Sequence, residues 1–136
     1  MGINDINAGE SSFSIQALRL IIRELEEAKA YDICQLDVRN LTDITDFMVI
    51  ASGSSHRHVH AMADRIREST RKESFRPIGI EGDSENDWVL MDFSGVVVHL
   101  MMPEVREFYK LESLWNDHLG RISTTQHDSS SDRQKR

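Results

Sequence analysis

The spacing of apolar residues along the chain predicts a helix followed by two strands. Over residues 14–30, apolar side chains recur every three or four positions, which is the period of an amphipathic helix, and Ser14 is a suitable N-cap. Residues 33–38 combine β-branched side chains with partial alternation, which is typical of a strand. The run at 47–51, FMVIA, is apolar throughout and predicts a buried central strand.

A second helix and a less regular strand are expected next. Ser55 can cap a helix over residues 56–72, where apolar positions again repeat at helical spacing. The stretch 75–80 has strand character, but Pro77 cannot donate to a ladder of hydrogen bonds. We therefore expect this strand at an edge of the sheet.

The last elements are predicted to be a hairpin and a third helix. Residues 88–92 and 96–101 form two strand-like runs joined by a turn at 93–95, and Pro103 suits the first turn of a helix over 104–118. The buried side of that helix is expected to carry Phe108, Leu111, Leu114 and Trp115. The order α-β-β-α-β-β-β-α predicts an α/β fold in which helices flank a small mixed β-sheet.

The composition indicates one soluble globular domain. The 136 residues are 39% hydrophobic and 29% charged, and no apolar run approaches the length of about 18 residues that a membrane span needs. We expect the domain at residues 13–119, with flexible polar tails at 1–12 and 120–136. The N-terminus does not resemble a secretory signal and Cys34 is the single cysteine, so a reducing, cytoplasmic environment is expected.

The charge balance narrows the classes of partner. With 16 basic and 23 acidic residues, the chain has a formal net charge of −7. Because tight binding to nucleic acid normally uses a basic face, direct sequence-specific recognition of nucleic acid is not expected. An acidic protein can still reach a ribonucleoprotein by docking on one of its basic proteins.

Three histidines, His56, His58 and His60, begin the second predicted helix and raise the question of a metal site. At helical spacing, His56, His60 and Asp64 share a face. However, Arg57 stands where zinc-protease motifs place a glutamate, and its charge would repel a cation. A solvated first helical turn is favoured over a metal site.

Other candidates for catalysis lack the partners that the chemistry needs. His99 lies in an apolar strand with no convincing converging nucleophile or carboxylate, so we expect a structural histidine, hydrogen-bonded within the sheet. Cys34 has no basic neighbour that would activate its thiol. The Gly53-Ser54 turn could receive a phosphate, but Asp64 is alone where two-metal enzymes place paired carboxylates. A plain strand-to-helix turn is favoured there.

The segment 81–92, EGDSENDWVLMD, is the most informative for function because it joins five acids and no base to a tryptophan. In a strand, Trp88 and Leu90 point to one face while Val89 and Met91 point to the other. Two interpretations are equally good on physical grounds. The segment is either a core strand with a solvated acidic loop, or an aromatic hot spot ringed by acids that binds a basic partner.

Three blocks of the sequence, in one colinear order over about residues 14–118, resemble the ribosomal silencing factor family, also called Iojap. Residues 46–59, DFMVIASGSSHRHV, are similar to the family segment D-[YF]-F-V-I-x-[ST]-G-x-S-x-R-H-V. The other two blocks are EG at 81–82 with WVLMD at 88–92 and VVVH at 96–99, and REFYKLESLWND at 106–117. They are similar to the family's E-G…W-x-L-x-D…V-V-V-H block and its R-x-[FY]-Y-x-L-E-x-L-W-x-D helix.

The resemblance implies a fold similar to nucleotidyltransferases but without their catalytic carboxylates, and therefore a protein that is not an enzyme and uses no cofactor. It implies a cytoplasmic translational repressor that binds the large ribosomal subunit through ribosomal protein fourteen. Bound there, the protein would sterically block association with the small subunit and damp translation when nutrients are limiting. The residues implied for partner binding are Trp88, Val89, Leu90, Glu81 and Asp92.

Two other functions stay open on the sequence. The first is a nucleotidyltransferase-type enzyme that uses the Gly53-Ser54 turn. The second is a homodimeric interaction module unrelated to ribosomes, and a homodimer off the ribosome would also fit an apolar strand edge.

Overall fold

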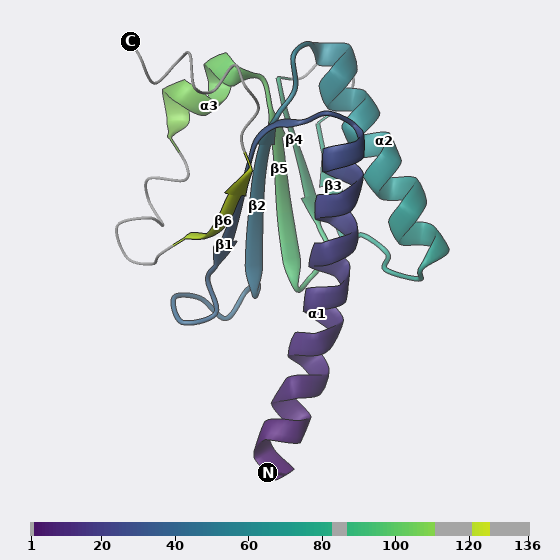
Figure 1. The fold of residues 1–136 in the computed structure, drawn as a ribbon, viewed down its shortest axis with the longest axis vertical. Coiled ribbons are helices and arrows are strands. Elements are labelled where there is room, and N and C mark those ends of the chain that lie inside the picture. Colours follow the sequence, from purple (N-terminus) through teal and green to yellow (C-terminus); the bar gives the residue numbers. More distant parts are fainter. Residues whose placement is uncertain (1, 83–86, 111–120, 126–136) are drawn as a thin grey trace.

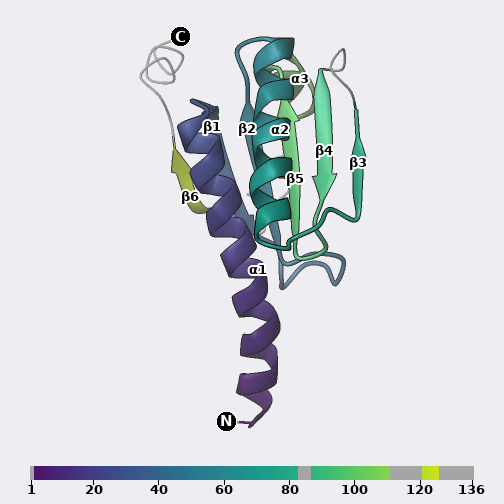
Figure 2. The same cartoon turned by 90° about the vertical axis from the view of Figure 1, so that its right-hand side faces the viewer.

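The computed structural model describes residues 2–82, 87–110 and 121–125, which form one mixed sheet with helices on both faces (Figures 1 and 2). The elements in chain order are α1 (Gly2–Glu27), β1 (Tyr31–Asp37), β2 (Phe47–Ser52), α2 (His56–Lys72), β3 (Gly79–Glu81), β4 (Trp88–Asp92), β5 (Val96–Met101), α3 (Pro103–Tyr109) and β6 (Arg121–Thr125). The predicted α/β fold with a small mixed sheet is confirmed.

The strand order across the sheet is β3-β4-β5-β2-β1-β6. β2 lies between β5, to which it is parallel, and β1, to which it is antiparallel, so its predicted central place is confirmed. β4 and β5 form the predicted antiparallel hairpin, and β3 lies at an edge as expected.

Helices α1 and α2 pack side by side on one face of the sheet and bury the main core (Figure 2). Ile21 and Leu25 from α1 meet Met62 and Ile66 from α2 above the inward side chains of the central strands. A second apolar cluster lies on the opposite face, where Val105 of α3 packs against buried residues. The buried members of that cluster are Cys34, Leu36, Val38, Ile50 and Met101.

The second helix begins and ends where its sequence pattern places it. Ser55 accepts a hydrogen bond from the backbone N–H of His58 at 3.0 Å, so the predicted N-cap is confirmed. Val59, Met62, Ala63 and Ile66 form its buried stripe.

The first helix is longer at its N-terminus than predicted. It begins at Gly2 instead of residue 14, so residues 2–12 of the predicted tail are helical. Figures 1 and 2 show this part of α1 extending beyond the end of the sheet. Ser14 is not an N-cap, because it lies inside the helix. Its hydroxyl donates to Asp46 Oδ2 at 2.7 Å and ties α1 to the residue before β2. Among the described residues, no helix has the length and apolar composition that crossing a bilayer requires.

The C-terminal part of the chain also departs from the prediction. Residues 121–125, expected in a flexible tail, form β6 and pair antiparallel with β1. That pairing uses backbone groups, which a search for apolar side chains does not detect. Helix α3 starts at Pro103 as expected but stops at Tyr109, where Lys110 adopts a left-handed conformation. Residues 111–120, which hold most of its predicted buried face and the end of the predicted domain, lie outside the described residues, as do 126–136.

The third strand is shorter than the predicted 75–80. Phe75 donates its backbone N–H to the carbonyl of Thr70 and so closes the end of α2 instead of entering the sheet. The first contact with β4 is made by Ile78, whose N–H donates to the carbonyl of Asp92. Pairing with β4 therefore begins only after Pro77.

Candidate partner-binding face

The alternation of β4 places its side chains on two different surfaces, as predicted. Val89 and Met91 are buried in the main core beneath α1 and α2. Trp88, Leu90 and Asp92 are half-buried on the opposite face of the sheet. The side chain of Val89 is only 2% exposed, so the structure does not present it to a partner. Val89 anchors β4 by packing in the main core.

Strand pairing brings Glu81 to the same face as Trp88. Glu81 of β3 is paired with Leu90, and the two members of a cross-strand pair point to the same side of a sheet. Glu81 is exposed at the sheet edge. Four of the five predicted site residues, all except Val89, therefore share one surface.

Pairing across β4, β5 and β2 adds apolar side chains that were not among the predicted site residues. Asp92 is paired with Val97 of β5, and Val97 with Met48 of β2. Both apolar side chains are half-buried. We call this surface the docking face, and it consists of Glu81, Trp88, Leu90, Asp92, Val97, His99 and Met48. The β3–β4 and β4–β5 pairings bring the first six of these residues together, and the parallel pairing of β2 with β5 adds Met48. No local pattern in the sequence indicates the parallel pairing.

Trp88 is held on this face by packing and by a hydrogen bond. Its ring packs against the cluster that contains Met101, Met48 and Val105. The indole Nε1–H donates to Nδ1 of His99 at 3.0 Å, and the two ring centroids are 5.7 Å apart. The expectation that His99 is a structural histidine hydrogen-bonded within the sheet is confirmed.

Asp92 has a structural task as well as a place on the docking face. Its Oδ1 accepts a hydrogen bond from the backbone N–H of Ser94 at 2.9 Å, which stabilises the hairpin turn where Ser94 has a positive φ of 75°. Of the other acids in the predicted cluster, Asp87 forms an ion pair with His56 of α2. Residues 83–86 lie outside the described residues.

The three histidines of α2 are engaged in separate interactions. His56 reaches Asp87, while His60 lies 3.6 Å from Asp64. His58 donates from Nε2 to the carbonyl of Ala28 at 2.7 Å and accepts the N–H of Ser54 at Nδ1. Within the described ranges, no three histidine, cysteine or acidic side chains come together in a way that could hold a metal ion.

The Gly53-Ser54 turn has few amides available for a phosphate. The Gly53 N–H donates to the carbonyl of Met101 at 3.0 Å, the Ser54 N–H to His58, and the His58 N–H to Ser55. A phosphate cradle needs such groups directed at the ligand. The interpretation as a plain, capped strand-to-helix turn is therefore favoured by the structure.

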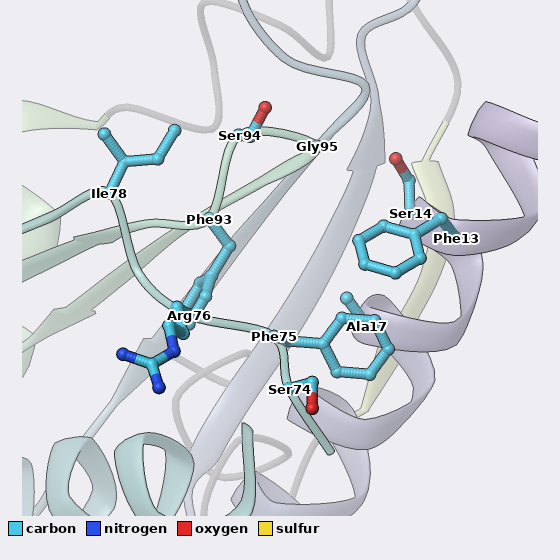
Figure 3. A pocket seen from close by; sticks show the side chains of 10 residues that line it. All are labelled: Phe13, Ser14, Ala17, Ser74, Phe75, Arg76, Ile78, Phe93, Ser94 and Gly95. Carbon is cyan, nitrogen blue, oxygen red and sulfur yellow. The ribbon is translucent and has the colours of Figure 1, made fainter. Parts of the chain in front are cut away.

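A cavity of about 260 Å³ lies on the other side of the sheet, between α1 and the hairpin turn (Figure 3). Figure 3 shows Phe13 and Phe75 side by side, with ring centroids 4.8 Å apart, and Phe93 across from them. Arg76 is the one charged side chain among the lining residues, and the hydroxyl of Ser14 is already bonded to Asp46. Histidine, cysteine and acidic side chains are absent from these lining residues.

We predict that His99 makes the protein less stable as the pH falls. Burial disfavours the charged imidazolium and lowers the pKa of His99 to about 4. The unfolded chain, with a histidine pKa near 6.5, takes up the proton first, so stability is lost between about pH 7 and pH 4. From this group alone, we expect a loss of about 2 kcal/mol at pH 5.

Urea unfolding of the wild type and of His99→Asn at pH 7.5 and pH 5 measures this contribution. The variant has no titrating group at this position, so its free energy of unfolding should fall less. An equal fall in both proteins would assign the pH dependence to other groups.

Comparison with known proteins identifies similar chains. The family described as "Ribosomal silencing factor during starvation" matches residues 11–136. A Chromobacterium violaceum protein named ribosomal silencing factor RsfS is 39% identical over 97 residues, which is 71% of this chain and 80% of that protein. A mouse protein named "Mitochondrial assembly of ribosomal large subunit protein 1" is 39% identical over 99 residues, covering 71% of this chain and 43% of the mouse protein.

Solved structures share the fold. A crystal structure of a Chromobacterium violaceum protein matches with a TM-score of 0.72 and 38% identity, and covers 74% of this chain and 84% of that one. A crystal structure from Bacillus halodurans matches with a TM-score of 0.68 and 27% identity over 82% of this chain and 98% of that one. Both matches support the arrangement of sheet and helices described above.

Proposed function

This chain belongs to the ribosomal silencing factor family, and from that premise we propose that it binds the large ribosomal subunit and prevents the small subunit from joining. The proposed contact is ribosomal protein fourteen, and the proposed place of action is the cytoplasm. The observation that carries the proposal is the convergence of Trp88, Leu90, Glu81 and Asp92 on one face of the sheet.

The chemistry of the docking face supports a basic protein as the partner. Two carboxylates, Glu81 and Asp92, border the half-buried apolar side chains of Trp88, Leu90 and Val97. An apolar centre with a charged rim is the usual build of a protein interface, and tryptophan is among the residues enriched at hot spots. Ribosomal proteins are typically basic, so a partner of opposite charge would associate faster and be selected over acidic surfaces.

The proposed mechanism is steric occlusion. An interface of about 800 Å² on each partner suffices for a specific complex, and a folded domain held there occupies the space that the small subunit needs. No bond is made or broken, so this function needs a rigid surface and no catalytic group. The sheet supplies that rigidity, because β4 is paired with β3 and β5, and β5 is paired with β4 and β2.

The enzyme alternative has a direct test. If the Gly53-Ser54 turn served nucleotidyl transfer, calorimetric titration with nucleotide and Mg²⁺ would give a specific heat of binding. We expect none, because the amides of the turn are bonded within the protein.

Sedimentation with purified ribosomal subunits tests the proposed function itself. We expect the protein to co-sediment with large subunits and to reduce the yield of joined ribosomes when small subunits are added. Normal subunit joining in the presence of saturating protein would overturn the proposal. Failure to co-sediment, together with a dimer in analytical ultracentrifugation, would favour the homodimeric module instead.

Binding to the large subunit is expected to weaken as salt is added. Charges on the acidic rim and the basic partner are screened beyond about 10 Å at 0.1 M salt. Measuring Kd between about 0.05 and 0.3 M potassium chloride should show a steady rise, and a smaller rise for Glu81→Gln. Salt-independent binding would mean that the acids only solvate the loop.

A further inference from the structure

We propose that His99 is a positioning residue that holds the indole of Trp88 in one orientation, so that the hot spot is arranged before the partner arrives. This inference rests on the proposed function for its effect on binding. The contact between the two side chains is independent of that function and can be tested without a ribosome.

The hairpin register places the two rings as diagonal neighbours. Trp88 is paired with Met101, and His99 is paired with Leu90 two positions along the ladder, so Trp88 and His99 lie on the same face. Diagonal neighbours are within reach of aromatic side chains. The hydrogen bond of 3.0 Å and the tilt of 50° between the rings show that they are in contact.

The hydrogen bond requires a particular state of each ring. An indole N–H can only donate, so Nδ1 of His99 must present its lone pair and the proton must be on Nε2. Lysine or arginine at this position could not accept the bond. A neutral imidazole therefore suits this position because it combines an acceptor with a flat ring that packs against the indole.

The surroundings of His99 keep the imidazole neutral near pH 7. Ile50 and Met48 on the β2 side are apolar, and in the described part of β3 and β4 the carboxylates on this face are Glu81 and Asp92. From α3, Arg106 directs its guanidinium to the hydroxyl of Ser52 at 3.0 Å. Burial lowers the pKa of His99 to about 4, so the acceptor is intact at pH 7.5.

Fixing Trp88 in advance should strengthen binding modestly. A partner that must immobilise a freely rotating side chain loses affinity, and the loss for one such side chain corresponds to roughly 3- to 10-fold in Kd. His99 makes this loss smaller by acting through Trp88, and this distinguishes its role from that of Trp88, which would pack directly on the partner.

The test uses His99→Leu, which has no acceptor, and His99→Asn, whose side-chain oxygen can replace Nδ1. Trp115→Phe is introduced in all proteins, because the chain has two tryptophans and Trp88 must be the one observed. The indole N–H resonance is followed by NMR, and Kd for large subunits is measured at pH 7.5. His60→Leu on α2, away from the docking face, is the matched control.

We expect His99→Leu to shift the indole resonance upfield, speed its exchange with water and raise Kd roughly 3- to 10-fold. His99→Asn should restore both readouts, and His60→Leu should change neither. In a Trp88→Ala background, His99→Leu should no longer affect Kd. In the wild type, acidification should change the indole resonance with a midpoint near pH 4, and His99→Asn should lack this step.

An indole resonance that is unaffected by His99→Leu or by acid would overturn the inference, and the acid titration decides the matter even if His99→Leu does not fold. The inference also fails if His99→Leu weakens binding equally with and without Trp88. If Trp88→Ala leaves Kd unchanged while the indole resonance responds to His99, the proposed docking face is wrong and only the contact between the two rings stands.

Discussion

Replacing Trp88 with alanine is expected to weaken binding to the large ribosomal subunit by about 2 to 4 kcal/mol, roughly 30- to 900-fold in Kd. The indole combines a large apolar surface with a fixed orientation, since it packs on the cluster around Met101 and donates to His99. Truncation would remove the contact with the partner and leave a hollow on the docking face. The dissociation constant should be measured by titration of labelled protein with large subunits.

The control for Trp88→Ala is Ile44→Ala. Ile44 is 81% exposed in the segment between β1 and β2 and is not part of the docking face, so its loss should leave Kd unchanged. Circular dichroism must show that each variant is folded, because Trp88 also contributes to packing. A folded Trp88→Ala protein that binds like the wild type would remove Trp88 from the interface.

Replacing Gly95 with alanine is expected to lower the free energy of unfolding by about 2 to 4 kcal/mol. A Cβ at this position would lie 2.1 Å from Oγ of Ser14 and 2.9 Å from its Cβ. Helix α1 would have to move away from the hairpin turn, and the hydrogen bond from Ser14 to Asp46 would be disturbed. The Gly95 carbonyl also accepts the N–H groups of Asp46 and Phe47, so the turn cannot shift freely.

The matched control is Gly79→Ala, because a Cβ at Gly79 meets no atom within 4 Å. That variant should be neutral or slightly stabilised, since alanine restricts the unfolded chain. Urea denaturation of both variants gives the comparison. If Gly95→Ala were as stable as Gly79→Ala, the close approach of α1 to the hairpin would not limit the packing of this domain.

Local periodicity predicted the elements whose stability depends on near neighbours in the chain. The bounds of α2, its cap at Ser55 and the β4–β5 hairpin agree with the pattern of apolar and polar residues. The pattern failed for β6 and for the first turns of α1, where backbone hydrogen bonds form without an apolar signature. It also overextended β3, because Phe75 closes the preceding helix.

The sequence predicted only part of the candidate site. A period of two put Trp88 and Leu90 on one face and Val89 on the other, and the structure agrees. The same reasoning should have excluded Val89 as a contact, since a strand next to a helical layer buries one of its two faces. The resemblance to the family implied Val89 as a contact, although the resemblance carries no information about the face of the strand on which Val89 lies.

Residue types and spacing were enough to indicate the class of fold and the acidic character of the chain, because periodicity and charge are read along the chain itself. The family was indicated by the resemblance of three sequence blocks to its motifs. The hydrogen bond between Trp88 and His99 depends on the register of the β4–β5 hairpin. The placement of Met48 beside Val97 and the close contact of Gly95 with Ser14 arise between segments that are distant in sequence. Such contacts depend on the order of strands in the sheet and on how closely the helices approach it. Those arrangements are set by packing between elements across the whole domain. Such packing does not produce a periodic pattern of residues within a single strand or helix.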